Sequence, residues 1–279
     1  MFSVYEVGDF VEVSGLSNFS TSHTFECGQC FRWNKDEDGA YVGVAFGHAA
    51  KIFKRRACLY ISGTMDEFEK IWRPYLDLDR DYDALRHRFA VDDFTRAATA
   101  FGSGIRMLKQ DPWETLCSFI LSQCCNIPRI KKMVEALCEN FGDPLDFEGK
   151  KLFTFPSAEK IAELSLSNLD VLRSGYRAPY VLSAARAVAD GEIVFEELYS
   201  MPTCDARKKV LSLNGIGPKV ADCFLLFGLQ KFDAFPVDTW IKKAQILYPG
   251  KLDPSRFGPY AGIAQQYLFF YARESGLKV

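Results

Sequence analysis

The sequence predicts an α+β protein that is mostly helical, with a small antiparallel β domain at its N-terminus. Two observations indicate this class. Between residues 9 and 63 apolar residues come in short, β-branched or aromatic runs, whereas from residue 65 onward they recur every three or four residues. With 279 residues, 48% of them hydrophobic, the chain can bury a substantial core. We expect a β domain with flanking helices over residues 1–100 and a helical domain over residues 101–279.

The predicted strands are short segments bounded by glycine or by Asp-Gly. They are DFVEVSG, CFRW, GAYVGVAFG, AAKIFKRR and ACLYISG. Between the second and third of them, KDEDGAY has the composition of a hairpin turn. Strands this short, joined by turns, favour an antiparallel sheet.

The predicted helices run from MDEFEKIWRPYL to the C-terminal segment GPYAGIAQQYLFFYARESG with few interruptions. Apolar residues at three- and four-residue spacing give each helix one face to bury. Several of these segments carry proline near the first turn, where a missing N–H is tolerated.

The overall charge does not indicate a nucleic-acid binder, because acidic residues slightly outnumber basic ones and the net charge is −2. Basic clusters are local, at residues 51–56, 129–132 and 207–209. Each cluster alone is typical of a solvated face. It gains meaning only if the fold brings it to a ligand shared with other residues.

No apolar run is long enough for a transmembrane helix, and the N-terminal residues do not form a basic-then-apolar signal peptide. We therefore expect an intracellular protein without a membrane partner, in the cytoplasm or nucleoid of a bacterium or in the nucleus of a eukaryote. Its nine scattered cysteines indicate reduced thiols. The CxxC pair Cys27 and Cys30 has no second ligand pair nearby, so we expect no metal site and no cofactor.

The segment LNGIGPKVADC, residues 213–223, predicts a turn between two helices. Gly215 and Gly217 can take positive φ, and the first-turn amides of the second helix are left free to bind a phosphate. The alternative is an ordinary tight turn with glycine C-caps. Lys219 lies on that first turn, where its amine is either a nucleophile or a cation that meets a phosphate.

Downstream, FPVDTW places Asp238 at the N-cap of a predicted helix. A carboxylate that accepts backbone N–H bonds stays ionised at neutral pH, and a fixed negative charge suits a developing cation. The plain alternative is a capping aspartate without a catalytic role. Asp222, by contrast, is expected to be an exposed helix acid.

These segments together resemble the helix-hairpin-helix DNA glycosylases, and within them the 8-oxoguanine DNA glycosylase branch. The resemblance runs in order from about residue 25 to the C-terminus, on the stretches LNGIGPKVADC, FPVDTW, ECGQCFRW, NIPRI, GYRAPYV and GPYAGIAQQYLF. It implies a TATA-binding-protein-like antiparallel β domain packed on helical domains. It also implies a bifunctional enzyme that flips 8-oxoguanine out of duplex DNA, excises it and nicks the strand.

By this resemblance, Lys219 attacks C1′ of the flipped nucleotide and forms a Schiff base, and Asp238 stabilises the positive charge that develops on the sugar. Amides around Gly215, Gly217 and Val220 hold the DNA backbone beside the lesion. No cofactor takes part in this scheme.

The resemblance also assigns the base pocket. The Gly28 carbonyl accepts the N7–H that distinguishes 8-oxoguanine from guanine, and Gln265 reads the Watson–Crick edge. Cys223, paired electrostatically with the lysine, and Phe269 contact the two faces of the base. Phe227 and Pro236 complete the pocket. For the aromatic residues the plain alternative is core packing.

The resemblance assigns Arg129, Tyr176 and Arg177 to the cytosine opposite the lesion and to the opened base stack. The expected partner is therefore double-stranded DNA with 8-oxoguanine, preferably opposite cytosine, bound by a monomer. Without the resemblance, we would interpret all three as ordinary surface residues.

Two departures from the family pattern affect contacts with DNA. QCCNI retains only Asn126 of an asparagine run, so Gln123 or Cys124 is expected to fill the gap that the flipped base leaves. Trp240 stands where a histidine is common, which puts one phosphate contact in doubt.

Three alternatives remain open at this point. An endonuclease III-like or adenine-mismatch enzyme usually carries a C-terminal iron–sulfur cluster, and no cysteine follows Cys223. Alkylpurine glycosylases generally lack the hairpin lysine. A non-catalytic DNA-binding module would leave Lys219, Cys223 and Asp238 without a shared purpose.

Overall fold

A six-stranded antiparallel sheet forms the N-terminal part of the computed structural model, which describes residues 2–276. The sheet order is β1-β2-β6-β5-β4-β3, and every neighbouring pair is antiparallel. The strands are β1 (Ser3–Val7), β2 (Phe10–Ser14), β3 (Asn34–Lys35), β4 (Tyr41–Ala45), β5 (His48–Arg55) and β6 (Cys58–Ser62). The predicted hairpin turn is confirmed, because β3 and β4 pair across it.

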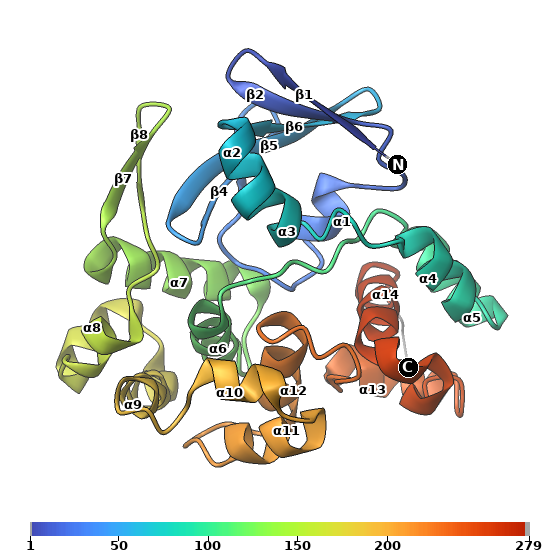
Figure 1. The fold of residues 1–279 in the computed structure, drawn as a ribbon. Coiled ribbons are helices and arrows are strands. Elements are labelled where there is room, and N and C mark those ends of the chain that lie inside the picture. Colours follow the sequence, from blue (N-terminus) through green and yellow to red (C-terminus); the bar gives the residue numbers. More distant parts are fainter. Residues whose placement is uncertain (1, 277–279) are drawn as a thin grey trace.

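Alternate residues of the central strands point into a hydrophobic core. Val11, Val13, Ile52 and Ile61 are fully buried there, as the two-residue period of a strand requires. This core is covered by a continuous helical stretch made of α2 (Met65–Glu67), η1 (Phe68–Trp72) and α3 (Arg73–Tyr75), which lies across the sheet (Figure 1).

The predicted strand CFRW is wrong. Residues 30–33 form a bend before β3, and their side chains enter two different cores. Cys30 and Trp33 pack in the sheet core, whereas Phe31 packs in the helical core. Because the segment passes between the two cores, no neighbouring strand pairs with its backbone in the described part of the chain.

Helices dominate the rest of the chain, which confirms the predicted fold class (Figure 1). Besides the short α1 (Thr21–Phe25), they are α4 (Tyr82–Phe89), α5 (Asp93–Phe101), α6 (Pro112–Leu121), α7 (Ile127–Phe141), α8 (Ala158–Ala162), α9 (Ala178–Ala189), α10 (Phe195–Ser200), α11 (Thr203–Leu211), α12 (Pro218–Phe227), α13 (Thr239–Leu247) and α14 (Ala261–Glu274). Shorter turns are η2 (Leu166–Leu172), η3 (Gly175–Arg177) and η4 (Pro254–Tyr260).

A second hairpin, β7 (Pro144–Phe147) and β8 (Lys150–Phe153), interrupts the helices and was not among the predicted strands. Its turn places Glu148 and Gly149 at positive φ, the geometry of a two-residue hairpin loop. The hairpin rises beside the N-terminal sheet and contacts β5 (Figure 1).

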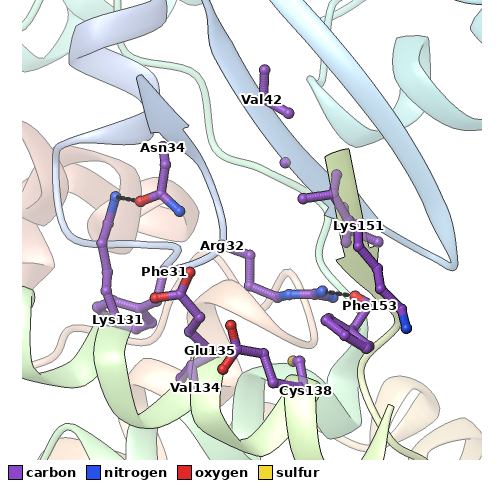
Figure 2. A pocket seen from close by; sticks show the side chains of 14 residues that line it. Phe31, Arg32, Asn34, Val42, Lys131, Val134, Glu135, Cys138, Lys151 and Phe153 are labelled. Carbon is purple, nitrogen blue, oxygen red and sulfur yellow. Dashed lines mark hydrogen bonds between the residues drawn. The ribbon is translucent and has the colours of Figure 1, made fainter. Parts of the chain in front are cut away.

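Buried polar side chains hold together the chain segments that lie between the two hydrophobic cores. Gln29 is fully buried, donates to the carbonyls of Thr24 and Arg106, and accepts from the Leu108 amide. Arg32 points toward the Phe153 carbonyl at the end of β8, and donates to it (Figure 2). The segment from 24 to 32 is thus fixed against both halves of the molecule.

The predicted division of the chain at residue 100 stays a prediction. Side chains of α4 and α5 belong to the larger hydrophobic cluster, together with those of α12 and α14. None of the helices within residues 2–276 is long and apolar enough to cross a membrane.

Candidate active site

The turn between α11 and α12 is built as a helical hairpin. Gly215 has φ +75, and a Cβ at this position would lie 2.3 Å from the Tyr180 ring. The φ angle of Gly217 is not positive, although the sequence had suggested it could be. This residue is the N-cap of α12, with extended backbone at φ −95 and ψ 174, because an N-cap residue sits just outside the helix. A Cβ on Gly217 would meet nothing within 4 Å, so the turn is open there.

Lys219 lies on the first turn of α12, next to Val220, whose side chain is buried. The Lys219 Nζ atom lies 3.4 Å from Ser122 Oγ and 5.2 Å from the centre of the Phe119 ring. Ser122 Oγ already donates to the Phe119 carbonyl at 2.8 Å, so it is an acceptor toward the amine. The amine is therefore held by contacts from the end of α6.

Asp238 is the N-cap of α13, as predicted, and accepts a hydrogen bond from the Ile241 amide at 2.9 Å. Burial raises the pKa of the Asp238 carboxyl above its ordinary value of 3.8, while the cap bond and the charge of Lys219 act in the opposite direction. The carboxylate and the amine thus belong to one electrostatic unit.

The structure brings every residue predicted for catalysis or base binding to one cavity. The space inside it, including its open mouth, is about 340 Å³. The lining residues are Gly28, Phe119, Lys219, Cys223, Phe227, Pro236, Asp238, Gln265, Gln266 and Phe269. The individual roles of the predicted residues stay predictions.

Two acceptors in this cavity have no partner within residues 2–276. Gln265 is buried and donates through Nε2 to the Pro236 carbonyl at 3.0 Å, which leaves its Oε1 atom unpaired. Because a carbonyl can only accept, this bond fixes the orientation of the amide. Gly28 also lines the cavity, and within residues 2–276 no donor bonds to its carbonyl. A ligand with N–H groups on two edges would match this pair.

Aromatic side chains form the apolar part of the cavity wall. Phe119 and Phe227 stack nearly parallel, with ring centres 5.3 Å apart. Burial raises the pKa of the Cys223 thiol to about 11, an effect that nearby Lys219 opposes and Asp238 reinforces. The thiol is therefore protonated at neutral pH, and its predicted electrostatic pairing with Lys219 stays a prediction.

An adjoining hollow extends the cavity toward the N-terminus of α7. It shares Gly28, Phe119, Lys219, Asp238 and Phe269 with the cavity. It adds residues of the loop before α7, with Trp240 and Arg273. Trp240, on the first turn of α13, also lies against the Lys243 amine, 4.8 Å from the ring centre.

The loop between α6 and α7 contains the predicted gap-filling residues. Gln123 donates to the Gly215 carbonyl at 3.1 Å and so ties this loop to the hairpin. Cys124 is exposed, with φ +47. Asn126 caps α7 by accepting from the Arg129 amide at 3.0 Å.

Tyr176 and Arg177 lie beside this loop. Tyr176 is 51% exposed, whereas the Arg177 side chain is buried and donates to the carbonyls of Gln123, Cys124 and Ser174. In this structure Arg177 holds the loop. Its contact with an opposite cytosine, like that of Arg129, stays a prediction.

Phe119, Ser122 and Gln266 belong to the site but were not predicted. Phe119 has the signature of an ordinary core residue, and Ser122 ends a helix. The one available signal was Gln266, because a second glutamine on the buried face of an apolar helix needs a partner.

Asp222 is not the exposed acid expected from its sequence. It is 9% exposed and pairs with Arg207 at 2.7 Å, and burial raises the pKa of its carboxyl to about 6 despite the arginine. Its position on α12 turns it toward α11, away from the cavity side chains.

The described residues contain no cluster of side chains suited to a metal ion. Cys27 and Cys30 are both buried free thiols, and burial raises the pKa of each.

Two family models of DNA repair proteins match adjoining parts of this chain. Residues 13–116 match the N-terminal domain of 8-oxoguanine DNA glycosylase, and residues 117–248 match the HhH-GPD superfamily of base excision DNA repair proteins. A probable N-glycosylase/DNA lyase of Methanothermobacter thermautotrophicus is 37% identical over 62% of this chain, which spans 65% of that relative. An N-glycosylase/DNA lyase of Arabidopsis thaliana is 31% identical over 88% of this chain and 75% of its own length.

A solved structure covers nearly the whole chain. The 8-oxoguanine glycosylase/lyase of Clostridium acetobutylicum, in complex with double-stranded DNA that has cytosine opposite 8-oxoguanine, is 36% identical and superposes with a TM-score of 0.93. The match covers 99% of both chains.

Proposed function

This chain belongs to the 8-oxoguanine DNA glycosylase family of helix-hairpin-helix base-excision repair enzymes, the bifunctional N-glycosylase/DNA lyases, and we propose that Lys219 is its nucleophile toward 8-oxoguanine in duplex DNA. One observation carries the proposal. The hairpin lysine and the capping carboxylate of Asp238 line a single cavity whose lining also includes Gly28, and no donor within residues 2–276 bonds to the Gly28 carbonyl.

The chemistry starts with the neutral Lys219 amine, which attacks C1′ of the flipped nucleotide. The N-glycosidic bond breaks, its electron pair leaves with the base, and the base takes up a proton. Ring opening of the sugar then gives an imine between Nζ and C1′. Loss of a proton from C2′ and cleavage of the C3′–O bond nick the strand by β-elimination.

Asp238 supplies the negative electrostatic field that this reaction needs. Positive charge grows on the sugar as the glycosidic bond breaks, and a carboxylate fixed at a helix N-terminus stabilises that charge without reorganising. The cap bond from Ile241 supports this role, because it holds the carboxylate in one orientation.

The two unpaired acceptors support a purine with N–H groups on two edges. The Gly28 carbonyl faces the edge on which 8-oxoguanine carries N7–H and guanine carries a lone pair. Gln265 Oε1 accepts from the N–H groups of the Watson–Crick edge. A buried acceptor left facing a lone pair discriminates strongly, since its hydrogen bond is lost.

We further propose that the enzyme prefers cytosine opposite the lesion, through Arg129, Tyr176 and Arg177, and that it acts as a monomer. The DNA in the solved complex of the Clostridium acetobutylicum enzyme has cytosine opposite 8-oxoguanine. Arg129 and Tyr176 lie at the loop that would face the opposite strand, and the exposed Tyr176 ring is suited to stacking.

A lesion panel tests the proposed function. Labelled duplexes carry 8-oxoguanine opposite each of the four bases, thymine glycol, 3-methyladenine or an A:G mismatch. We expect nicking of the 8-oxoguanine duplexes alone, fastest opposite cytosine. Preferential cleavage of any other lesion would refute the substrate assignment, and equal rates opposite cytosine and adenine would refute the role of the three opposite-strand residues.

A further inference from the structure

Three of the four carbonyl groups of residues 26 to 29 accept hydrogen bonds from side chains of distant elements. Glu26 O accepts from Arg273 Nη2 at 2.6 Å, and Cys27 O accepts from Gln266 Nε2 at 2.8 Å. Gln29 O accepts from Gln110 Nε2 at 2.8 Å. Within residues 2–276, Gly28 O is therefore the one carbonyl of this run that no protein donor occupies.

We propose that Gln266 and Arg273 are positioning residues that aim the Gly28 carbonyl into the base cavity and thereby set the discrimination between 8-oxoguanine and guanine. This inference rests on the proposed function, in which that carbonyl reads N7–H. Neither side chain needs to touch the base, because each acts on a peptide group next to Gly28.

Both donors come from α14, the helix that also presents Gln265 and Phe269 to the cavity. Gln266, Phe269 and Arg273 are separated by three and four residues, so they share the face of α14 that packs on the loop. A Cβ on Gly28 would lie 3.3 Å from the Phe269 ring and 3.2 Å from Arg273 Nη1. The loop therefore lies directly on the helix that forms the base-binding wall.

The loop needs this support because Gly28 is at φ +87, a region that glycine enters and leaves at little cost. Gln266 is buried, so its removal leaves the Cys27 carbonyl without a partner in an apolar setting. The simplest remedy is rotation of the neighbouring peptide groups, which would turn the Gly28 carbonyl away from the base.

The two activities of the enzyme, base excision and strand nicking, distinguish a positioning role of Gln266 and Arg273 from a general structural role. Excision of 8-oxoguanine needs the base cavity, whereas nicking at a preformed abasic site needs only the amine and the sugar. We therefore measure both rates, in single turnover and opposite cytosine, for Gln266→Met, Arg273→Met and Arg273→Lys. Arg256→Met is the matched control, because Arg256 also donates to a main-chain carbonyl, that of Lys251, but lies on η4.

We expect both methionine variants to excise 8-oxoguanine about tenfold more slowly or worse, and to lose markedly less of the abasic nicking rate than of the excision rate. Arg273→Lys should recover most of the excision rate, since a lysine amine can still donate to the Glu26 carbonyl. The Arg256 control should match the parent in both assays.

Equal losses in both assays, or excision unchanged in the two methionine variants, would overturn the inference. If Gln266→Met does not fold, the two Arg273 variants decide, since the Arg273 side chain lines the adjoining hollow and is only partly buried. A parent enzyme that nicks abasic DNA but leaves 8-oxoguanine intact would instead refute the proposed function, so the two failures are distinguishable.

Discussion

Asp238 combines two tasks in one side chain. As the N-cap of α13 it accepts a backbone hydrogen bond, and as a cavity residue it presents charge to the substrate. Burial raises the pKa of this carboxyl above 3.8, so ionisation costs stability in the folded protein as pH rises through and beyond that value. Function at this residue therefore works against stability.

The substitution Asp238→Asn separates the two tasks. Asparagine caps helices as well as aspartate does, and it removes the buried charge. We expect the Tm at pH 7 to stay within about 2 °C of the parent or to rise, while single-turnover excision falls about 10² to 10³-fold. A large drop in Tm would show that the carboxylate is mainly structural.

The raised pKa of Asp238 also predicts the acid limb of the rate profile. If the ionised carboxylate is required, excision is lost as pH falls through its folded pKa, so the midpoint of this limb lies above 3.8. The measurement is single-turnover excision against pH with the folded state monitored by circular dichroism. The same limb should be absent from the residual activity of Asp238→Asn.

Individual residues also show where prediction from sequence works and where it stops. The positions of Lys219 on the first turn of a helix and of Asp238 at an N-cap were predictable from a turn motif and a capping pattern, whereas their catalytic roles stay predictions. Asp222 was wrongly expected to be exposed, since its partner Arg207 lies on another helix. Gln266 was missed because its partner, the Cys27 carbonyl, is 239 positions away in the chain.

The hairpin between α11 and α12 depends on its two glycines for different reasons. Gly215 is at positive φ against the Tyr180 ring, whereas Gly217 is an extended N-cap with open space around it. We expect Gly215→Ala to destabilise the protein by about 1–3 kcal/mol and Gly217→Ala by less than about 1 kcal/mol. Thermal or urea unfolding of both variants checks the difference, and equal losses would contradict this account of the turn.

The junction of α6 with the β domain contains a second costly carboxyl. Burial raises the pKa of Glu114 to about 7 although Arg32 lies 3.4 Å away. A carboxyl with a raised folded pKa loses stability as pH rises from its ordinary 4.5 through about 7, and the full cost is present above that. We therefore expect Glu114→Gln to raise the Tm at pH 8 by about 2 °C or more, and to leave it unchanged near pH 4.5. A gain at both pH values would indicate another cause.

Helices and strands were predictable where all their apolar side chains pack into the same hydrophobic core. The central strands and most helices follow from their apolar periodicity. The segment CFRW failed because its side chains divide between two cores, so its composition resembles a strand although its backbone is not paired. The β7–β8 hairpin was missed because it is short and lies within an otherwise helical region. Its Glu-Gly turn is the signal that would have indicated a hairpin.

At the scale of the whole molecule, net charge and binding surface are separate properties. The chain carries a net charge of −2, yet the hairpin and the helix N-termini of α7, α12 and α13 gather at one site. Phosphate contacts at such a site release counterions, so we expect affinity for 8-oxoguanine DNA to fall about tenfold or more between 50 and 200 mM salt. A flat response in a fluorescence anisotropy titration would contradict binding through the DNA backbone.

Across the whole account, the claim with the most consequences is that the Lys219 amine forms a covalent bond with the sugar of the lesion. The most direct measurement is borohydride trapping on 8-oxoguanine DNA, followed by mass spectrometry of the digested adduct. The account predicts one modified peptide, with the DNA remnant on Lys219, and no adduct with Lys219→Gln. An adduct on another residue, or trapping undiminished in that variant, would contradict it.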